Sequence, residues 1–137
     1  MKRYYLDTSI WLDFLEDRNE PDLPKSDWAT ELIKKIIGEN GQIIYSDLIV
    51  AELAVSNYTR AEINVFFNKL RPILRYVEPH ARLLGKAKDL AKKRYIPKGD
   101  ALHALIAREE KAILVTLDHH FKQLADICKP RKPTDII

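Results

Sequence analysis

The sequence predicts an α/β fold, a short parallel sheet of about four to five strands with helices on both faces. Short apolar segments alternate along the chain with longer segments of helical periodicity. This alternation is typical of parallel sheets whose strands are joined by helices. The 137 residues have the commonest length of one domain, and no repeat or linker divides them. We therefore expect a single domain spanning residues 1–137.

The expected strands are short and rich in aromatic and β-branched residues. The clearest is Ala-Ile-Leu-Val-Thr at 112–116, and Arg-Tyr-Tyr-Leu at 3–6 is the next. The remaining candidates are 42–45, 75–77 and 127–128. Residues 19–25 carry two prolines and are expected to form a loop.

The first expected helix follows Asp7-Thr8-Ser9, where capping residues precede the apolar spacing of Ile10, Trp11, Phe14 and Leu15. The second is expected at 26–37 and ends at the glycine signal of 38–41. Further helices are expected after Ser46, at 59–74, at 79–94, at 100–110 and, as a short helix, from Asp118.

Composition predicts a soluble cytoplasmic protein. Apolar residues make up 46% and charged residues 31% of the chain, as in ordinary globular proteins. No segment approaches the ~20 apolar residues of a membrane span. Asp7 stands where a signal peptide would need its apolar run. One cysteine is present, which fits a reducing compartment.

Three aspartates follow strands or open helices. Asp7 comes directly after the 3–6 strand, Asp118 lies just beyond the 112–116 strand, and Asp100 opens a helix. In parallel sheets the functional crevice lies beyond the carboxyl ends of the strands, so these acids are expected to meet there. The alternative for each is a purely structural helix cap.

Glu52 lies in the segment 48–55, which is apolar on nearly all sides. Such a helix is usually buried, and a carboxylate within it needs a compensating cation or strong hydrogen bonds. A functional metal ion is one such cation. An ion pair with a lysine or arginine is the competing interpretation.

Four clustered carboxylates would repel one another unless a divalent ion held them. Their ligand atoms are hard oxygens, which suit Mg²⁺ or Mn²⁺ better than zinc. We therefore expect a cofactor of this kind and hydrolysis of a phosphodiester by an activated water molecule.

Net charge is only +3, but cations are concentrated between residues 86 and 98. This run leads directly into Asp100, so Lys93, Arg94 and Lys98 are candidates for binding the phosphates of a nucleic acid such as RNA. The alternative is a solvated helix face.

We expect structural roles for the three histidines near these acids. His103, His119 and His120 lack the i, i+4 spacing of helical ligand pairs. His103 follows Asp100 by three residues and so lies on roughly the same helical face.

Four segments together resemble the motifs of the PIN domain family. They are Tyr-Tyr-Leu-Asp-Thr-Ser at 4–9, Ser-Asp-Leu-Ile-Val-Ala-Glu-Leu at 46–53, Gly-Asp-Ala-Leu-His-Ala-Leu-Ile-Ala at 99–107 and Leu-Val-Thr-Leu-Asp-His-His-Phe at 114–121. Each motif alone is weak, but all four occur in the family's order and spacing across essentially the whole chain.

This resemblance implies a three-layer PIN-like fold and an endoribonuclease, a hydrolase that cleaves phosphodiester bonds in RNA. It implies that Asp7 and Asp100 bind the metal directly, and that Glu52 and Asp118 bind it directly or through water.

The resemblance further assigns Ser9 and Thr116 to positions that support the carboxylates through hydrogen bonds, although capping or strand-end roles fit both equally well. The compact length is most similar to VapC toxins of type II toxin–antitoxin systems, which implies a partner antitoxin. A twofold homodimer is also expected, because it is the commonest oligomer. The antitoxin is expected to lay a helix near Trp11, Phe14 and 26–37, and to extend an arginine or lysine into the acids.

Three alternatives remain open. A stand-alone PIN endoribonuclease of RNA processing can be equally short. A phosphatase of the haloacid-dehalogenase type would use Asp7 as nucleophile, but Ser9 replaces the second aspartate of that family's motif. A non-catalytic interaction module would use the acids only as helix caps.

Overall fold

The computed structural model describes residues 1–137 and contains a five-stranded sheet in which every neighbouring pair of strands is parallel. The strands are β1 (Arg3–Leu6), β4 (Gln42–Ser46), β5 (Leu74–Val77), β6 (Ile113–Val115) and β7 (Pro130–Arg131). Their order across the sheet is β5-β4-β1-β6-β7. The expected short parallel sheet is therefore confirmed.

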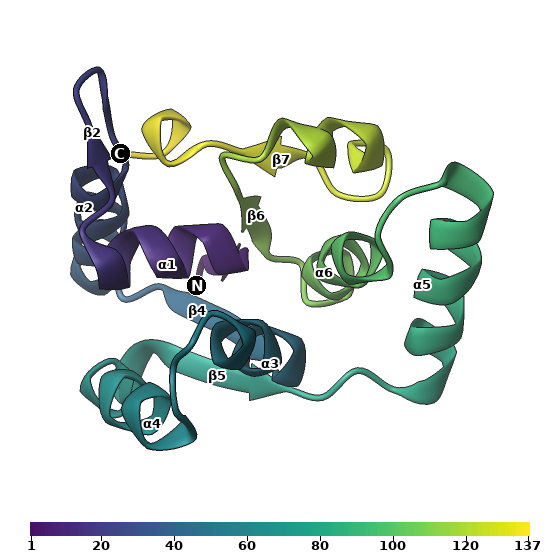
Figure 1. The fold of residues 1–137 in the computed structure, drawn as a ribbon, viewed down its shortest axis with the longest axis horizontal. Coiled ribbons are helices and arrows are strands. Elements are labelled where there is room, and N and C mark those ends of the chain that lie inside the picture. Colours follow the sequence, from purple (N-terminus) through teal and green to yellow (C-terminus); the bar gives the residue numbers. More distant parts are fainter.

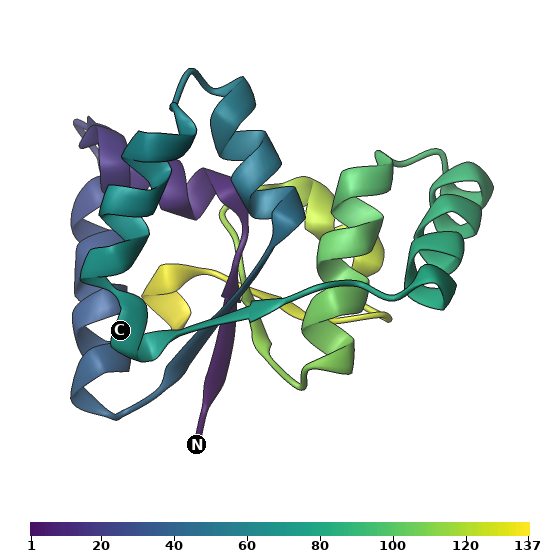
Figure 2. The ribbon, with the colours of Figure 1, turned by 90° about the horizontal axis from the view of Figure 1, so that it is seen from below.

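Helices cover both faces of this sheet. They are α1 (Thr8–Glu16), α2 (Lys25–Gly38), α3 (Asp47–Val55), α4 (Arg60–Lys69), α5 (Ala81–Arg94) and α6 (Lys98–Glu109), with 3₁₀ turns at Arg71–Ile73, His119–Leu124 and Pro133–Asp135. Helices α1 and α2 lie on one side of the sheet, and α5 and α6 lie on the other (Figures 1 and 2). The result is the expected three-layer α/β architecture. No helix is long and apolar enough to cross a membrane.

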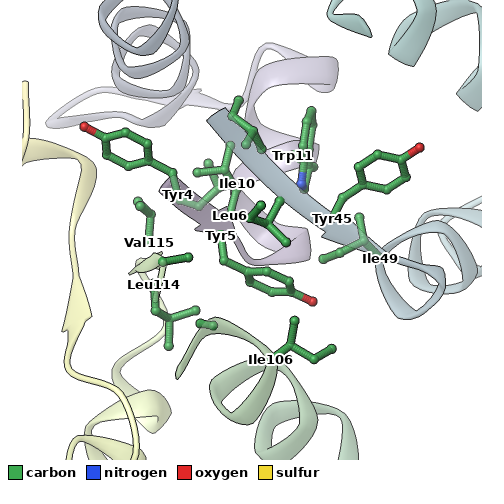
Figure 3. Packing of buried hydrophobic residues seen from close by; sticks show 14 of the residues in the cluster. Tyr4, Tyr5, Leu6, Ile10, Trp11, Tyr45, Ile49, Ile106, Leu114 and Val115 are labelled. Atoms are coloured by element: carbon green, nitrogen blue, oxygen red, sulfur yellow. The ribbon is translucent and has the colours of Figure 1, made fainter. Parts of the chain in front are cut away.

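The central strand β1 is buried on both faces. Tyr4, Tyr5 and Leu6 are all 0% exposed, and their alternating directions place them in the two halves of the core (Figure 3). Trp11 of α1 is also fully buried, with its ring centroid 5.0 Å from that of Phe67 on α4. Removing these apolar groups from water fixes the first strand at the centre of the sheet.

The strand order reverses at β1. From β1 the chain adds β4 and then β5 on one side, and it later returns to add β6 and then β7 on the other. Ligands of such sheets bind outside the carboxyl ends of the strands where the order reverses. That position lies between the ends of β1 and β6, immediately before Asp7 and Thr116.

Two of the expected segments have a different structure from the one predicted. The expected loop at 19–25 contains a small hairpin, β2 (Asn19–Glu20) paired with β3 (Leu23–Pro24). The last strand is β7 rather than 127–128, because the amides of Ile127 and Cys128 both donate to the Leu124 carbonyl and form a turn. Pro130 lacks an amide hydrogen, which an edge strand tolerates.

The expected helix at 59–74 is shorter in the structure. Helix α4 ends at Lys69, and a 3₁₀ turn containing Pro72 follows before β5 begins. Proline cannot donate the hydrogen bond that would continue an α-helix, so the chain changes direction there.

Candidate active site

Asp7 lies at the carboxyl end of the central strand and is only 5% exposed. Its Oδ1 accepts hydrogen bonds from Ser9 Oγ at 2.7 Å and from the Ile10 amide at 3.2 Å, while Oδ2 accepts from Thr116 Oγ1 at 2.7 Å. Asp7 is thus the N-cap of α1. The capping role and the proposed ligand role can coincide in one side chain, because Oδ2 accepts a single hydrogen bond and retains a second lone pair.

Thr116 connects Asp7 to Asp118. Its hydroxyl donates to Asp7 and accepts from the Asp118 amide at 2.9 Å. Asp118 in turn caps the 3₁₀ turn His119–Leu124 and accepts from the His120 amide at 2.9 Å. The structure therefore ties the residue after β1 to the residues after β6 through a single hydroxyl group.

Glu52 is less buried than the apolar segment around it suggested. That expectation is wrong because only Ile49 and Leu53 of α3 are buried, whereas Val55 is 84% exposed. The Glu52 side chain is 37% exposed, and its Oε1 accepts from Thr8 Oγ1 and His103 Nε2, each at 2.6 Å. No lysine or arginine pairs with it. The compensating groups are a hydroxyl and an imidazole.

Asp100 lies in the first turn of α6, where the helix begins close to Glu52. A Cβ atom at the preceding Gly99 would lie 3.6 Å from Glu52 Oε2. Burial raises the pKa of Asp100, and the negative charges of Asp118, Glu52 and Asp7 raise it further. The four predicted acids therefore share one electrostatic environment at this edge of the sheet.

The other two inner carboxylates respond differently to their surroundings. Burial raises the pKa of Asp7 above its ordinary value, although hydrogen bonds from Thr116 and Ser9 oppose that rise. Burial also opposes ionisation of Glu52, but the hydrogen bond and charge of His103, with the hydrogen bond from Thr8, outweigh it and lower the Glu52 pKa. Glu52 is consequently an anion at neutral pH.

The four acids are not packed tightly enough to form a closed ligand set by themselves. The group whose ligand atoms all lie within 4.8 Å of one another is instead Asp118, His119 and His120. His120 Nδ1 lies 2.8 Å from Asp118 Oδ1. The wider spacing of the acids suits an ion that keeps several waters, as Mg²⁺ does.

Sequence reasoning missed the two donors to Glu52. Thr8 was read as part of a capping segment and His103 as structural. Only the three-residue separation of His103 from Asp100 pointed toward the site. Neither pairing has a local signal, because the contacts join residues 44 and 51 positions apart.

The candidate RNA-binding residues fall into two groups. Lys93 and Lys98 are exposed. Arg94 makes a bidentate ion pair with Asp126, with distances of 2.8 and 2.7 Å, and also donates to the Gln123 carbonyl. Its guanidinium is therefore already engaged, whereas the two lysines make no ion pair.

A larger hollow lies away from the acids. A cavity of about 510 Å³ between α3, α4 and the ends of β4 and β5 is lined by Tyr45, Asp47, Arg60, Phe67 and Tyr76, among others. Glu52 is not among its lining residues. A smaller cavity of about 180 Å³ is lined by Tyr95, Pro97, Asp100 and His120 and therefore includes one of the four acids, Asp100.

The structure is thus an α/β domain with carboxylates near the point where its parallel strand order reverses. The chain belongs to the PIN domain family, since the family's model matches residues 4–127. No curated protein matches the sequence.

Solved structures with the same fold match nearly the full length of the chain. VapBC2 from Rickettsia felis, bound to a DNA fragment from its promoter, is 21% identical with a TM-score of 0.68, covering 95% of this chain and 98% of that chain. A toxin–antitoxin complex from Klebsiella pneumoniae is 16% identical, with a TM-score of 0.67 and coverage of 95% and 97%. FitAcB from Neisseria gonorrhoeae is 20% identical, with a TM-score of 0.64 and coverage of 97% and 99%.

Proposed function

We propose that this chain is a divalent-metal-dependent endoribonuclease that cleaves RNA by hydrolysis. Three observations in a PIN domain support the proposal: Thr116 links Asp7 to Asp118, Gly99 brings the start of α6 beside Glu52, and the charges of these three acids raise the Asp100 pKa. Helix caps alone account for Asp7 and Asp118. They do not account for Asp100, whose pKa is raised by burial and by the charges of Asp118, Glu52 and Asp7 against the opposing charge of His103.

The donor set fits Mg²⁺ or Mn²⁺. Every side chain of the four acids offers hard oxygens, and the charges that raise the Asp100 pKa are those a bound cation would offset. Asp7 and Asp100 would hold the ion directly, and Glu52 and Asp118 directly or through water. When bound, the ion would neutralise phosphate charge and lower the pKa of an attacking water.

The chain's own residues would orient these carboxylates. Ser9 and Thr116 hold the two oxygens of Asp7 from opposite sides, and Thr116 also positions the backbone of Asp118. Water would attack phosphorus in line with the leaving oxygen, and the P–O bond to that oxygen would break. The acids would keep the attacking water and the phosphate in this arrangement.

Chelation tests this mechanism directly. We expect purified protein to cleave single-stranded RNA with Mg²⁺ or Mn²⁺, to lose activity in EDTA, and to regain it when excess Mg²⁺ is restored. Circular dichroism should show the same fold in both conditions. Undiminished cleavage in EDTA would contradict the metal-dependent mechanism.

The exposed lysines beside α6 are proposed to contact RNA phosphates. Lys98 lies two residues before Asp100, and Lys93 lies on α5, which packs against α6. Replacing both with glutamine should weaken RNA binding and reduce the slope of log K against log salt by about 0.7 per lost contact. Fluorescence anisotropy with a labelled oligoribonucleotide in EDTA measures this without cleavage.

A matched control removes two lysines elsewhere. Lys34→Gln with Lys35→Gln changes the net charge equally on α2, far from α6 in the fold (Figure 1). This control should leave the salt slope near that of the wild type. Equal slopes for both double variants and the wild type would mean that Lys93 and Lys98 form only a solvated face.

We further propose that the chain is the toxin of a toxin–antitoxin pair and forms a twofold homodimer. Its fold matches toxin–antitoxin structures over nearly the whole length. Trp11 is too buried to contact a partner. The proposed antitoxin surface therefore centres on Phe14 and on Val65 and Phe66 of α4, where a shallow, mostly apolar hollow of about 330 Å³ lies.

A cationic side chain from the antitoxin could reach the acids from that surface. Phe14 and the capping residue Asp7 belong to the same short helical segment, so a helix docked on α1 would lie close to the acidic edge. An arginine or lysine there would offset the charge that a metal otherwise balances. Inhibition and metal binding would then be mutually exclusive.

A further inference from the structure

His103 is the one buried histidine of the chain, and the proposed mechanism leaves it unused. It lies in the middle of α6, is 1% exposed, and uses both ring nitrogens. Nε2 lies 2.6 Å from Glu52 Oε1, and Nδ1 lies 2.7 Å from the hydroxyl of Tyr5. The Tyr5 hydroxyl lies 3.0 Å from Ser46 Oγ. Tyr5 and Ser46 are both 0% exposed.

The chemistry of the groups fixes how hydrogens are placed at the Glu52 end. An ionised carboxylate only accepts hydrogen bonds, so Nε2 must carry a hydrogen and donate it. With a neutral imidazole, Nδ1 accepts from Tyr5 and Tyr5 accepts from Ser46. With an imidazolium, the hydrogens between Nδ1, Tyr5 and Ser46 reverse, but the donation to Glu52 remains. The contact therefore does not depend on the charge of His103.

The two oxygens of Glu52 consequently have different environments. Oε1 receives both donors, Thr8 from α1 and His103 from α6. Oε2 receives no hydrogen bond and lies beside Gly99, next to Asp100. A partly exposed glutamate would otherwise sample several rotamers at a cost in ordering entropy. Here one oxygen is anchored, and the other accepts no hydrogen bond and lies beside the start of α6.

We propose that His103 is a positioning residue that, held in turn by Tyr5 and Ser46, fixes Glu52 so that Oε2 faces the metal site. Ser46 ends β4, Tyr5 lies in β1, His103 is in α6 and Glu52 is in α3. These contacts connect Glu52 through His103 to two fully buried residues of the sheet, which restricts the movement of the Glu52 side chain. This inference rests on the proposed metal site, and residues that orient metal ligands typically change affinity 10–100-fold when removed.

Calorimetric titration with Mn²⁺ alone tests the inference without any nuclease assay. His103→Leu removes the donor and should weaken Mn²⁺ binding about 10–100-fold. His103→Gln places an amide N–H near the Nε2 position and should restore much of the affinity. Tyr5→Phe keeps the ring but removes the partner of Nδ1, so it should give an intermediate loss.

A double-mutant cycle separates positioning from general destabilisation. In a Glu52→Gln background, His103→Leu should cause little further loss, because the two residues act through one contact. Ile106→Val, a substitution at a buried residue of the same helix that keeps both hydrogen-bond donors to Glu52, controls for loosening of α6. Thermal unfolding of each variant shows whether it is folded at the titration temperature.

The outcomes are distinct. Wild-type protein that binds no Mn²⁺ would overturn the proposed metal site together with the inference. Wild-type binding with unchanged affinity in His103→Leu, or in Tyr5→Phe if the leucine variant does not fold, would overturn the positioning role alone. Losses in Ile106→Val equal to those in His103→Leu would also overturn it.

Discussion

Asp100→Asn is expected to abolish RNA cleavage while making the metal-free protein more resistant to heat. Asp100 is a proposed direct ligand, so the activity loss should exceed about 100-fold, the upper range for residues that only orient ligands. The stabilisation has a separate cause. Burial and the charges of Asp118, Glu52 and Asp7 disfavour the Asp100 carboxylate, and the neutral amide removes that repulsion.

The raised pKa of Asp100 also predicts how the stability of the metal-free protein depends on pH. Because the Asp100 pKa is raised in the folded state, the native protein binds more protons than the unfolded chain between the two pKa values. The contribution of Asp100 to the stability of the fold is therefore present at low pH and lost as the pH rises through its pKa in the folded state. Melting temperatures in EDTA across this range should fall less steeply with rising pH in Asp100→Asn than in the wild type.

Asp7→Asn should be equally inactive but should gain less stability. The Asp7 carboxylate accepts hydrogens from Ser9, Thr116 and the Ile10 amide, and an amide group there turns one acceptor into a donor that faces another donor. Asp89→Asn on the exposed face of α5 is the matched control and should change neither activity nor melting temperature. Near-wild-type cleavage by Asp7→Asn or Asp100→Asn would exclude the proposed ligand set.

Expression of this chain alone in a bacterial host is expected to arrest growth. This expectation rests on the proposed toxin function, in which the nuclease would cleave RNA of its own cell unless a partner covered the four acids. Growth curves and colony counts after induction measure the effect. Asp100→Asn should remove the arrest at equal protein level, because arrest requires cleavage.

The control for this experiment is Asp89→Asn, which should arrest growth as the wild type does. Immunoblots must show equal accumulation of all three proteins. Wild-type protein that accumulates without harm, yet cleaves RNA in vitro, would contradict the toxin proposal. A stand-alone RNA-processing nuclease would then be the better interpretation, and the chemistry at the acids would be unaffected.

Much of the fold was predictable because its signals are local. The 3–6 and 112–116 strands were recognised from apolar and β-branched residues, and α1 from the capping segment that begins at Asp7. Prediction was weaker where one local signal competed with another. The segment 127–128 looks like a strand, but its amides close a turn onto Leu124, and β7 forms from the proline-containing tail instead.

Capping chemistry and hydrophobic periodicity depend on neighbours along the chain, so the sequence alone identifies which acids follow strands and open helices. Tertiary structure alone decided the strand order, and with it which strand ends face one another. It also decided that Thr8 and His103 anchor Glu52 and that Asp126 engages Arg94. These contacts join residues 32 to 51 positions apart. Only packing of the helices against the sheet brings such residues together, so no local pattern records them.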